Sequence, residues 1–198
     1  EHIAKIQIDP TDKKVIYVAA PGPLYKPSAH RGLYKSTDGG KTWNKILFID
    51  ENTGCADIAI SPQNPNIIFA SSWQFRRKPF SFVSGGEGSG FYKSTDGGKT
   101  WKKLTKGLPE GNLGRIVITA NPSKPSHILA LVEAKQSGLY QSSDDGESWT
   151  LLTTATGLMA RPFYFSTLVI DPKDPKRVYR PAYEFAYSND GGSTFSNT

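Results

Sequence analysis

Arginine and aromatic side chains gather in two stretches of the chain, residues 73–89 and 161–165. Aromatic rings stack on sugars or apolar side chains, and a guanidinium grips a carboxylate through two parallel hydrogen bonds. The predicted ligand-binding residues are therefore Trp73, Phe75, Arg76, Arg77, Glu87, Arg161, Phe163 and Tyr164. The alternative interpretation is that the aromatic rings form a small core beneath their own loop while the arginines pair locally.

A hydrolytic function would need paired carboxyl groups. A glycosidase holds two carboxyls roughly 5–10 Å apart across the bond that it cleaves. The acids expected on the long loops are Asp50, Glu51, Glu87, Glu110, Glu133 and Glu184. Because the sequence does not indicate which of them converge, no catalytic residue is predicted and an enzymatic activity stays open.

Other reaction chemistries have no matching pattern in the sequence. His2, His30 and His127 stand far apart without a ligand-spaced partner, so neither a metal nor a cofactor is expected. No G-x-S-x-G segment is present to place a nucleophilic serine. The glycine-rich run 85–90 precedes a predicted strand and lacks the Lys-Ser/Thr of a phosphate-binding loop, which indicates a flexible loop.

An eight-residue motif that occurs four times predicts the scaffold that positions the candidate ligand-binding residues. It reads S-T-D-G-G-K-T-W at 36–43 and again at 94–101, S-S-D-D-G-E-S-W at 142–149, and S-N-D-G-G-S-T-F at 188–195. The copies start 58, 48 and 46 residues apart, a spacing typical of stacked or radial repeats. Asp-Gly dipeptides favour tight hairpins, whereas a calcium loop would need a distal glutamate that no copy has.

Each copy is expected to use its acid at the centre of the turn and its aromatic residue as an anchor between neighbouring units. The acid of such a turn accepts hydrogen bonds from the amides that follow it. The predicted structural residues are Asp38, Trp43, Asp96, Trp101, Asp145, Trp149, Asp190 and Phe195.

The octamer resembles the Asp-box, or BNR, repeat of sialidases, xyloglucanases and sortilin-type propellers. Between the copies lies a second shared phrase, an apolar run, an x-Pro turn and another apolar run, as in 6–18 and 58–70. The phrases at 71–79, 84–90 and 161–164 are similar to those of large bacterial sortilin-like BNR proteins, which are often labelled glycosyl hydrolases. The resemblance implies an all-β fold of four-stranded antiparallel propeller blades.

The repeats divide the chain into about four blades within one propeller segment. The expected blades cover residues 1–54, 55–112, 113–164 and 165–198, each with four short strands. No segment keeps an apolar helical period over three turns, so no substantial helix is expected. Closed rings of the resembled family are larger, which implies that the chain is part of a longer protein and packs against the rest of its own propeller.

The connections of an up-and-down blade alternate between two ends of the sheet. The turns at one end are short and formulaic, whereas the connections at the other end are long: 21–31, 49–56, 73–89, 105–114 and 153–166. We call the end with these five connections the long-loop face. Variable loops that a rigid scaffold brings together commonly bind ligands, so this face is the predicted binding surface.

Composition limits the possible partners and cellular locations of the protein. The net charge of +6 comes from 24 basic and 18 acidic residues, but most lysines stand singly in turns, so no nucleic-acid partner is expected. No apolar run reaches the length of a membrane span. A single cysteine, Cys55, excludes an internal disulfide framework. The expected location is secreted, periplasmic or on the bacterial cell surface.

The leading functional hypothesis is a non-catalytic recognition or scaffold propeller that binds a protein, peptide or glycan through the long-loop face. One alternative is a xyloglucanase-like or sialidase-like glycoside hydrolase acting on a polysaccharide, although the first-arginine motif of sialidases is missing. Another is a subunit or assembly factor of a membrane complex, as some propellers of the resembled family are.

Overall fold

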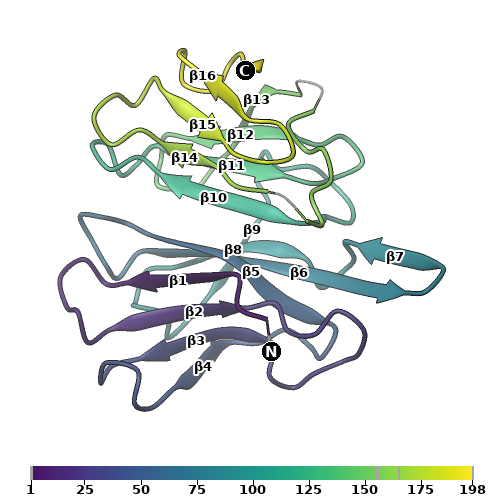
Figure 1. The fold of residues 1–198 in the computed structure, drawn as a ribbon. Helices are drawn as coiled ribbons and strands as arrows, with labels where there is room; N and C mark the ends of the chain where they lie inside the picture. The colour runs from purple at the N-terminus through teal and green to yellow at the C-terminus, as the bar shows by residue number, and fades with distance from the viewer. Residues whose placement is uncertain (1, 155–156, 165, 198) are drawn as a thin grey trace.

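The chain folds into four consecutive antiparallel sheets, seen as four fanned layers in Figure 1. This computed structural model describes residues 2–154, 157–164 and 166–197. Every regular element in these residues is a strand, and none is a helix. The predicted all-β architecture of four propeller blades is confirmed.

The strands follow one another in space in their order along the chain. The first blade contains β1 (Lys5–Ile8), β2 (Ile16–Ala20), β3 (Gly32–Ser36) and β4 (Asn44–Leu47). The second contains β5 (Thr53–Ile60), β6 (Ile68–Lys78), β8 (Gly90–Ser94) and β9 (Lys102–Leu104), with β7 (Ser81–Ser84) paired to the end of β6. The third contains β10 (Ile116–Ala120), β11 (Ile128–Val132), β12 (Gly138–Ser142) and β13 (Thr150–Thr153). The fourth contains β14 (Val169–Ile170), β15 (Val178–Arg180), β16 (Ala186–Ser188) and β17 (Ser196–Asn197).

The blades share an axis that runs along their first strands. β1 contacts β5, β5 contacts β10, and β10 contacts β14. Central strands are buried on both faces: all residues of β5 and β11 are buried, and β11 reads as an uninterrupted apolar run, ILALV. Apolar residues fill the space between each pair of successive blades, so the core consists of three interblade layers.

The repeated octamers form the turns that the sequence predicts. In the first copy, the Ser36 hydroxyl donates to Asp38 Oδ1 at 2.8 Å, and the Lys41 and Thr42 amides donate to the same oxygen at 2.9 Å. The Thr42 hydroxyl donates to Asp38 Oδ2 at 2.6 Å. Asp96 and Asp190 hold their turns through matching contacts. In the turn, backbone amides thus donate their hydrogen bonds to the aspartate carboxylate and not to a neighbouring strand.

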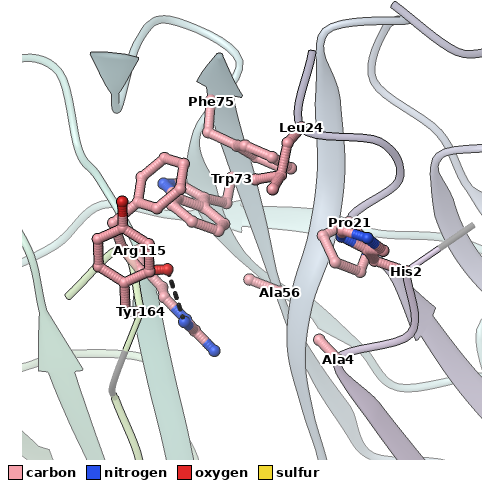
Figure 2. A pocket seen from close by; sticks show the side chains of 10 residues that line it. His2, Ala4, Pro21, Leu24, Ala56, Trp73, Phe75, Arg115 and Tyr164 are labelled. Atoms are coloured by element: carbon pink, nitrogen blue, oxygen red, sulfur yellow. Dashed lines mark hydrogen bonds between the residues drawn. The ribbon is translucent and has the colours of Figure 1, made fainter. Parts of the chain in front are cut away.

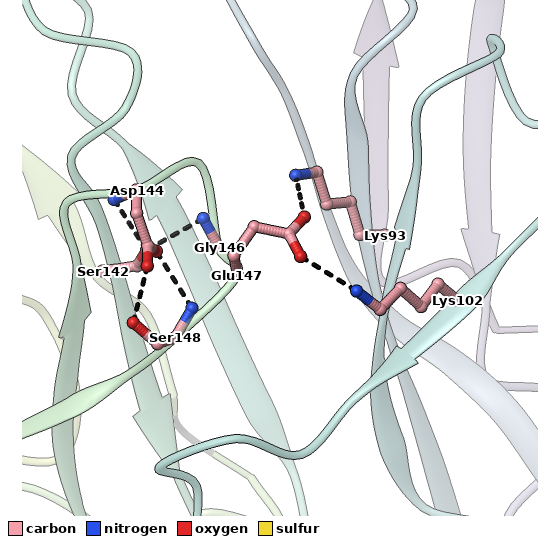
Figure 3. A network of polar contacts seen from close by, with 7 residues as sticks. All are labelled: Lys93, Lys102, Ser142, Asp144, Gly146, Glu147 and Ser148. Carbon is pink, nitrogen blue, oxygen red and sulfur yellow. Dashed lines mark hydrogen bonds and ion pairs between the residues drawn. The ribbon is translucent and has the colours of Figure 1, made fainter.

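The third copy corrects one predicted residue. The sequence analysis placed the turn acid at Asp145, but Asp144 accepts the hydrogen bonds of Ser142 and Ser148 (Figure 3). Asp145 instead stands where the other copies have their first glycine and takes a left-handed conformation with φ 58°. Aspartate tolerates this conformation better than most residues, which made the neighbouring Asp-Gly dipeptide a misleading signal.

The aromatic residues of the last three copies are interblade anchors, as predicted. Trp149 is 4% exposed, Trp101 packs partly buried between the first two blades, and Phe195 does so between the last two. Trp43 is the exception, because it is 40% exposed and donates its indole N–H to Gly40 of its own turn. No other blade among the described residues covers it.

Ionic contacts join the second blade to the third. Glu147 lies in the third turn and bonds to Lys93 Nζ at 2.7 Å and Lys102 Nζ at 2.9 Å (Figure 3). Hydrogen bonds from Lys93 and then Lys102 lower the pKa of Glu147 to about 2. Lys93 is nearly buried whereas Glu147 is half exposed, so water weakens the pair and its contribution to stability is modest.

We expect the turn acids to make the protein labile to acid. Hydrogen bonds within their turns lower the pKa of Asp38 and of Asp190 to about 2, with the hydroxyls of Thr42 and Thr194 as the largest causes. An aspartate in an unfolded chain titrates near ~3.9. Because the folded pKa is the lower one, this stabilisation is fully present above about pH 4 and is lost as the pH falls through about 2. The urea concentration at the midpoint of unfolding should therefore decrease steeply as the pH is lowered from about 4 to about 2.

The double variant Asp38→Asn and Asp190→Asn distinguishes the contribution of these two turn acids to acid lability from that of other acidic residues. Its urea midpoint is expected to be lower at neutral pH and to change less between about pH 4 and pH 2. An equally steep fall in the variant would show that other groups cause the acid lability.

Candidate functional site

The long connections meet around one pocket of about 270 Å³ near the blade axis (Figure 2). The first blade and its loop form one side, and residues of the later blades form the other. The pocket is lined by His2, Ala4, Pro21, Leu24, Ala56, Trp73, Phe75, Arg115, Phe163 and Tyr164. Four of the eight predicted ligand-binding residues are in this set.

Direct contacts show that the long connections do gather at one end of the blades. Arg77 in β6 donates its amide to the Leu24 carbonyl at 3.0 Å, and Gly86 donates its amide to the Leu113 carbonyl at 3.1 Å. The Phe163 ring lies 5.1 Å from the Trp73 ring. The two stretches that carry the predicted ligand-binding residues are therefore neighbours, as expected. Phe165, the last residue of the second stretch, lies outside the described residues.

The segment 73–89 contains a strand pair, and the glycine-rich run 85–90, which the sequence predicts to be a flexible loop, is joined to it by hydrogen bonds. β6 continues to Lys78 and pairs with β7, with Arg77 opposite Phe82. The glycine-rich run that follows is tied to Gln74, which accepts the Gly85 amide at its carbonyl and the Gly88 amide at its side chain. Glycine and serine therefore serve close backbone approach here rather than mobility.

Three predicted ligand-binding aromatics form the wall of the pocket instead of an open platform. Trp73, Phe75 and Phe163 are 4%, 2% and 7% exposed and pack together in one cluster. Trp73 stacks on Phe75 at 4.3 Å, and Phe163 meets both rings edge-on. Most of their surface is buried against one another, which agrees with the alternative interpretation that these rings form a small core beneath their own loop. Only the remaining surface faces the pocket.

The exposed side chains of this group stand at the rim. The Arg77 guanidinium donates to the Tyr164 hydroxyl, and Tyr164 is 54% exposed beside Phe163. Arg76 points the other way and bonds to the Tyr25 carbonyl and the Asn52 side chain. Both arginine side chains thus bond to nearby residues, and that of Arg77 contacts Tyr164, which lines the pocket.

Arg115 places the one guanidinium inside the pocket, and the sequence analysis missed it. Its Nη1 donates to the Pro162 and Phe163 carbonyls at 3.2 and 3.5 Å, and its guanidinium carbon lies 5.4 Å from the Trp73 ring centre. Its buried Nε has no hydrogen-bond partner among the described residues. Burial lowers the pKa of Arg115 from its ordinary value, while the charges of Asp57 and Glu133 oppose this effect.

A hydrogen-bonded carboxylate fixes the position of Arg115. Glu133 Oε2 accepts the Arg115 amide at 2.7 Å and the Ser84 hydroxyl at 2.7 Å. Arg115 follows a glycine and immediately precedes β10. A lone arginine before a strand belongs to no motif, so no sequence pattern indicates that Arg115 lines a pocket.

The floor of the pocket is a β-bulge in the first strand of the second blade. The pairing of β5 with β6 shifts between Cys55 and Asp57, which leaves Ala56 as the extra residue. Below it, Asp57 Oδ1 pairs with Lys5 Nζ at 2.6 Å. A second cavity of about 260 Å³ follows the axis here and shares Ala4, Ala56 and Arg115 with the first.

Two cationic side chains line the two axial cavities, and Glu133, which accepts the Arg115 amide, lies just outside their lining. Arg115 and Lys5 are cationic, and Asp57 is the one anion among the residues that line the two cavities. The Ser166 hydroxyl, which lines the lower cavity, is buried without a hydrogen-bond partner in the described part of the chain.

The other two predicted ligand-binding residues lie elsewhere. Glu87 is exposed and lines a different pocket together with Lys103 and Glu110. Arg161 has a left-handed backbone with φ 52°, and its guanidinium lies 5.0 Å from the Tyr183 ring. The sequence could not separate these residues from the pocket because loop conformation decides their direction.

None of the described residues that line the axial pocket is an aspartate or glutamate. Throughout the described ranges, no group of three or more His, Cys, Asp and Glu side chains is placed to hold a metal ion. No helix within those ranges is long and apolar enough to cross a membrane.

Comparison with protein families finds the BNR/Asp-box repeat at residues 34–45 and 92–103, which include the whole of the first two octamers. A search of curated protein sequences found no match. The fold is similar to that of an ancestral GH74 enzyme, with a TM-score of 0.69, 18% identity and coverage of 100% of this chain and 25% of that chain. It is equally similar to the GH74 xyloglucanase from Xanthomonas campestris, with a TM-score of 0.69, 18% identity and coverage of 96% and 28%.

A third similar structure is YCF48 bound to D1 peptide, with a TM-score of 0.56, 15% identity and coverage of 98% of this chain and 52% of that chain. The chain therefore spans about a quarter of the length of the GH74 enzymes and about half of YCF48. At these identities the likeness concerns the fold alone. The chain thus has the fold of propeller blades and contains two segments that match the BNR/Asp-box repeat.

Proposed function

We propose that the chain is a non-catalytic recognition module of a secreted or cell-envelope bacterial protein of the sortilin-like BNR type. It captures a peptide or protein segment in the axial pocket of the long-loop face. The observation that carries this proposal is the guanidinium of Arg115, whose buried Nε is unpartnered inside an otherwise apolar pocket. The D1 peptide bound to YCF48 supports a peptide ligand on a propeller of this fold.

The chemistry of the pocket specifies the bound segment. Pro21, Leu24 and the edge of Trp73 offer apolar walls to one aliphatic or aromatic side chain. Arg115 would receive a carboxylate from the same segment, because a guanidinium binds a carboxylate more strongly than it binds a neutral acceptor. A glycan is the less suitable ligand, since the rings of Trp73, Phe75 and Phe163 are buried against one another and leave little surface on which a sugar could stack.

Substitution of Arg115 tests this function. We expect Arg115→Gln to weaken binding by about 10-fold to 100-fold, because a hydrogen bond to a charged group contributes about 1.5–3 kcal/mol. The probe is an array of random hexapeptides with either free or amidated carboxyl termini, followed by fluorescence anisotropy on the strongest binders. Arg76→Gln is the matched control, since Arg76 lies outside the pocket and should change affinity little.

The same assay separates the alternatives. Unchanged peptide affinity in Arg115→Gln, with folding verified by circular dichroism, would refute the axial site. A panel of plant and microbial polysaccharides should be neither bound through Arg115 nor cleaved. Release of reducing sugar ends by the wild-type chain would favour the glycoside hydrolase instead.

A further inference from the structure

The hairpin that the end of β6 forms with β7 projects beyond the second blade (Figure 1). β6 pairs with β5 up to Gln74, and from there to its end its strand partner is β7. We call residues 75–84 the β6–β7 hairpin. The first and third blades stand on either side of the second, so the exposure of this hairpin does not arise at the outer face of the first or last blade.

The β6–β7 hairpin exposes apolar side chains at its tip and on both of its faces. Pro79 and Phe80 form the turn at the tip, and Phe80 is 99% exposed. Phe82 and Val83 are 57% and 50% exposed, and they point to opposite faces because successive residues of a strand alternate. Side chains so exposed add little to the packing of their own domain, and an apolar patch of this kind marks a site of interaction with another surface.

The same hairpin carries positive charge without negative charge. It contains Arg76, Arg77 and Lys78 and no aspartate or glutamate. Both guanidinium groups bond to uncharged oxygen atoms, and no salt bridge within the described ranges includes any of the three cations. Glu133 does reach the hairpin, but it accepts the hydroxyl of Ser84, at the end opposite the tip. The tip therefore presents positive charge next to its apolar side chains.

Two neighbouring loops continue this surface. The Arg77 amide donates to the Leu24 carbonyl, and Tyr25, the next residue, is 71% exposed and is followed by the exposed Lys26. On another side, the Tyr164 ring centre lies 5.8 Å from the Arg77 guanidinium carbon. Aromatic rings with a polar tip and long basic side chains are the residues that proteins place where apolar and aqueous phases meet. The composition of this surface therefore matches the interface of a lipid bilayer.

We propose that the β6–β7 hairpin docks the long-loop face on a bilayer that contains anionic phospholipid. Phe80 enters the interfacial layer first, and Phe82 and Val83 follow it on the two faces of the hairpin. Arg76 and Lys78 lie beside them and bind lipid phosphates, since a negative membrane surface attracts basic side chains close to it. The contact is peripheral, because the hairpin enters the surface of the bilayer and does not cross it.

The shape of the hairpin favours a lipid surface over an acidic protein. A protein partner holds a protruding aromatic side chain in a cavity of matching shape and covers one face of the element that carries it. Here the exposed apolar residues lie at the tip and on both faces, so a single protein surface would leave some of them in water. A layer of lipid headgroups surrounds an inserted hairpin on all sides and needs no matching cavity.

This docking does not depend on the peptide capture proposed above. Phe75, in the same strand as the basic residues, lines the axial pocket, whereas Phe80 does not. Docking through the tip would hold the axial pocket close to the membrane surface. Phe80→Ala should therefore leave the affinity for soluble peptides unchanged, so that either proposal can fail without the other.

Sedimentation with large unilamellar vesicles tests the docking. We expect the wild-type chain to bind vesicles of phosphatidylcholine and phosphatidylglycerol in equal parts, to bind pure phosphatidylcholine vesicles far less, and to be released by salt. Phe80→Ala should weaken binding about 10-fold through lost apolar burial. Lys78→Glu should weaken it about 25-fold, because each basic charge near an anionic surface contributes a factor of about 5 and the reversal counts twice.

Lys99→Glu is the matched control. It makes the same change in net charge on an exposed side chain of the second blade, but in the octamer turn at the opposite end. We expect it to change vesicle binding little. Because Lys78, Phe80 and Lys99 are all exposed, each variant should keep the wild-type circular dichroism spectrum.

Phe80→Trp distinguishes insertion from a purely electrostatic contact. Lipids brominated on their acyl chains should quench its fluorescence more than that of the wild-type chain, whose four tryptophans lie outside the hairpin. The proposal is overturned if anionic vesicles do not bind the chain, or if Lys99→Glu weakens binding as much as Lys78→Glu. Binding that survives Phe80→Ala without quenching in Phe80→Trp overturns it as well. Retention on immobilised polyglutamate without vesicle binding would assign the hairpin to an acidic protein instead.

Discussion

Trp149→Ala is expected to lower the free energy of unfolding by about 3–5 kcal/mol, the usual cost of emptying a large buried site. Trp149 is 4% exposed between the second and third blades, and its ring lies 4.9 Å from the Phe91 ring. Alanine would leave a void lined by residues of both blades, which the rigid strands on either side cannot close. Urea unfolding followed by circular dichroism measures the loss.

Trp43→Ala is the matched control for this prediction. Trp43 occupies the same position of its octamer but is 40% exposed, so we expect its removal to cost less than about 1 kcal/mol when the chain is monomeric. Trp149→Phe should fall between the two, because it keeps a ring and removes an indole N–H that has no partner in the described structure. Equal losses for Trp43→Ala and Trp149→Ala would mean that the octamer aromatic stabilises its own turn and not the interblade layer.

The scaffold was predictable because its determinants are local and repeated. The Asp-Gly turns, the acid at their centre and the apolar strands each depend on residues within a few positions, and four copies confirm one another. The Asp145 error arose from following the Asp-Gly dipeptide, whereas the position within the octamer aligns Asp144 with Asp38, and the hydrogen bond from Ser142 confirms Asp144. The exposure of Trp43 depends on whether another structure packs against the first blade, and the octamer sequence alone does not predict this.

The candidate site was predictable only in its location. The alternation of strands brings the long connections together, and this is why Trp73, Phe163 and Tyr164 were expected to meet. Whether an aromatic ring faces solvent or its neighbours depends on packing between distant segments, so exposed rings could not be distinguished from buried ones. Arg115 and Asp57 escaped notice for the same reason, because their roles arise from contacts across three blades.

Asp57→Ala is the second change with a large expected effect, because Asp57 joins three blades at the axis. Its Oδ1 pairs with Lys5 of the first blade at 2.6 Å and accepts the amide of Ile58, while its Oδ2 accepts the amide of Ile118 in the third blade at 2.8 Å. The residue is 5% exposed. Alanine would leave two buried amides and one ammonium without their acceptor, and breaking such a pair costs about 3–5 kcal/mol.

Two further variants separate the buried acceptor from the ion pair. Lys5 is 37% exposed, so water would solvate part of its charge, and Lys5→Met should cost less than Asp57→Ala. Asp57→Asn retains one acceptor oxygen of nearly the same shape and should fall between them in urea unfolding. If Lys5→Met proved as harmful as Asp57→Ala, the ion pair and not the amide contacts would hold the axis together. The expected order places most of the stability of the axis in the hydrogen bonds that Asp57 accepts from the second and third blades, with a smaller part in its ion pair with Lys5.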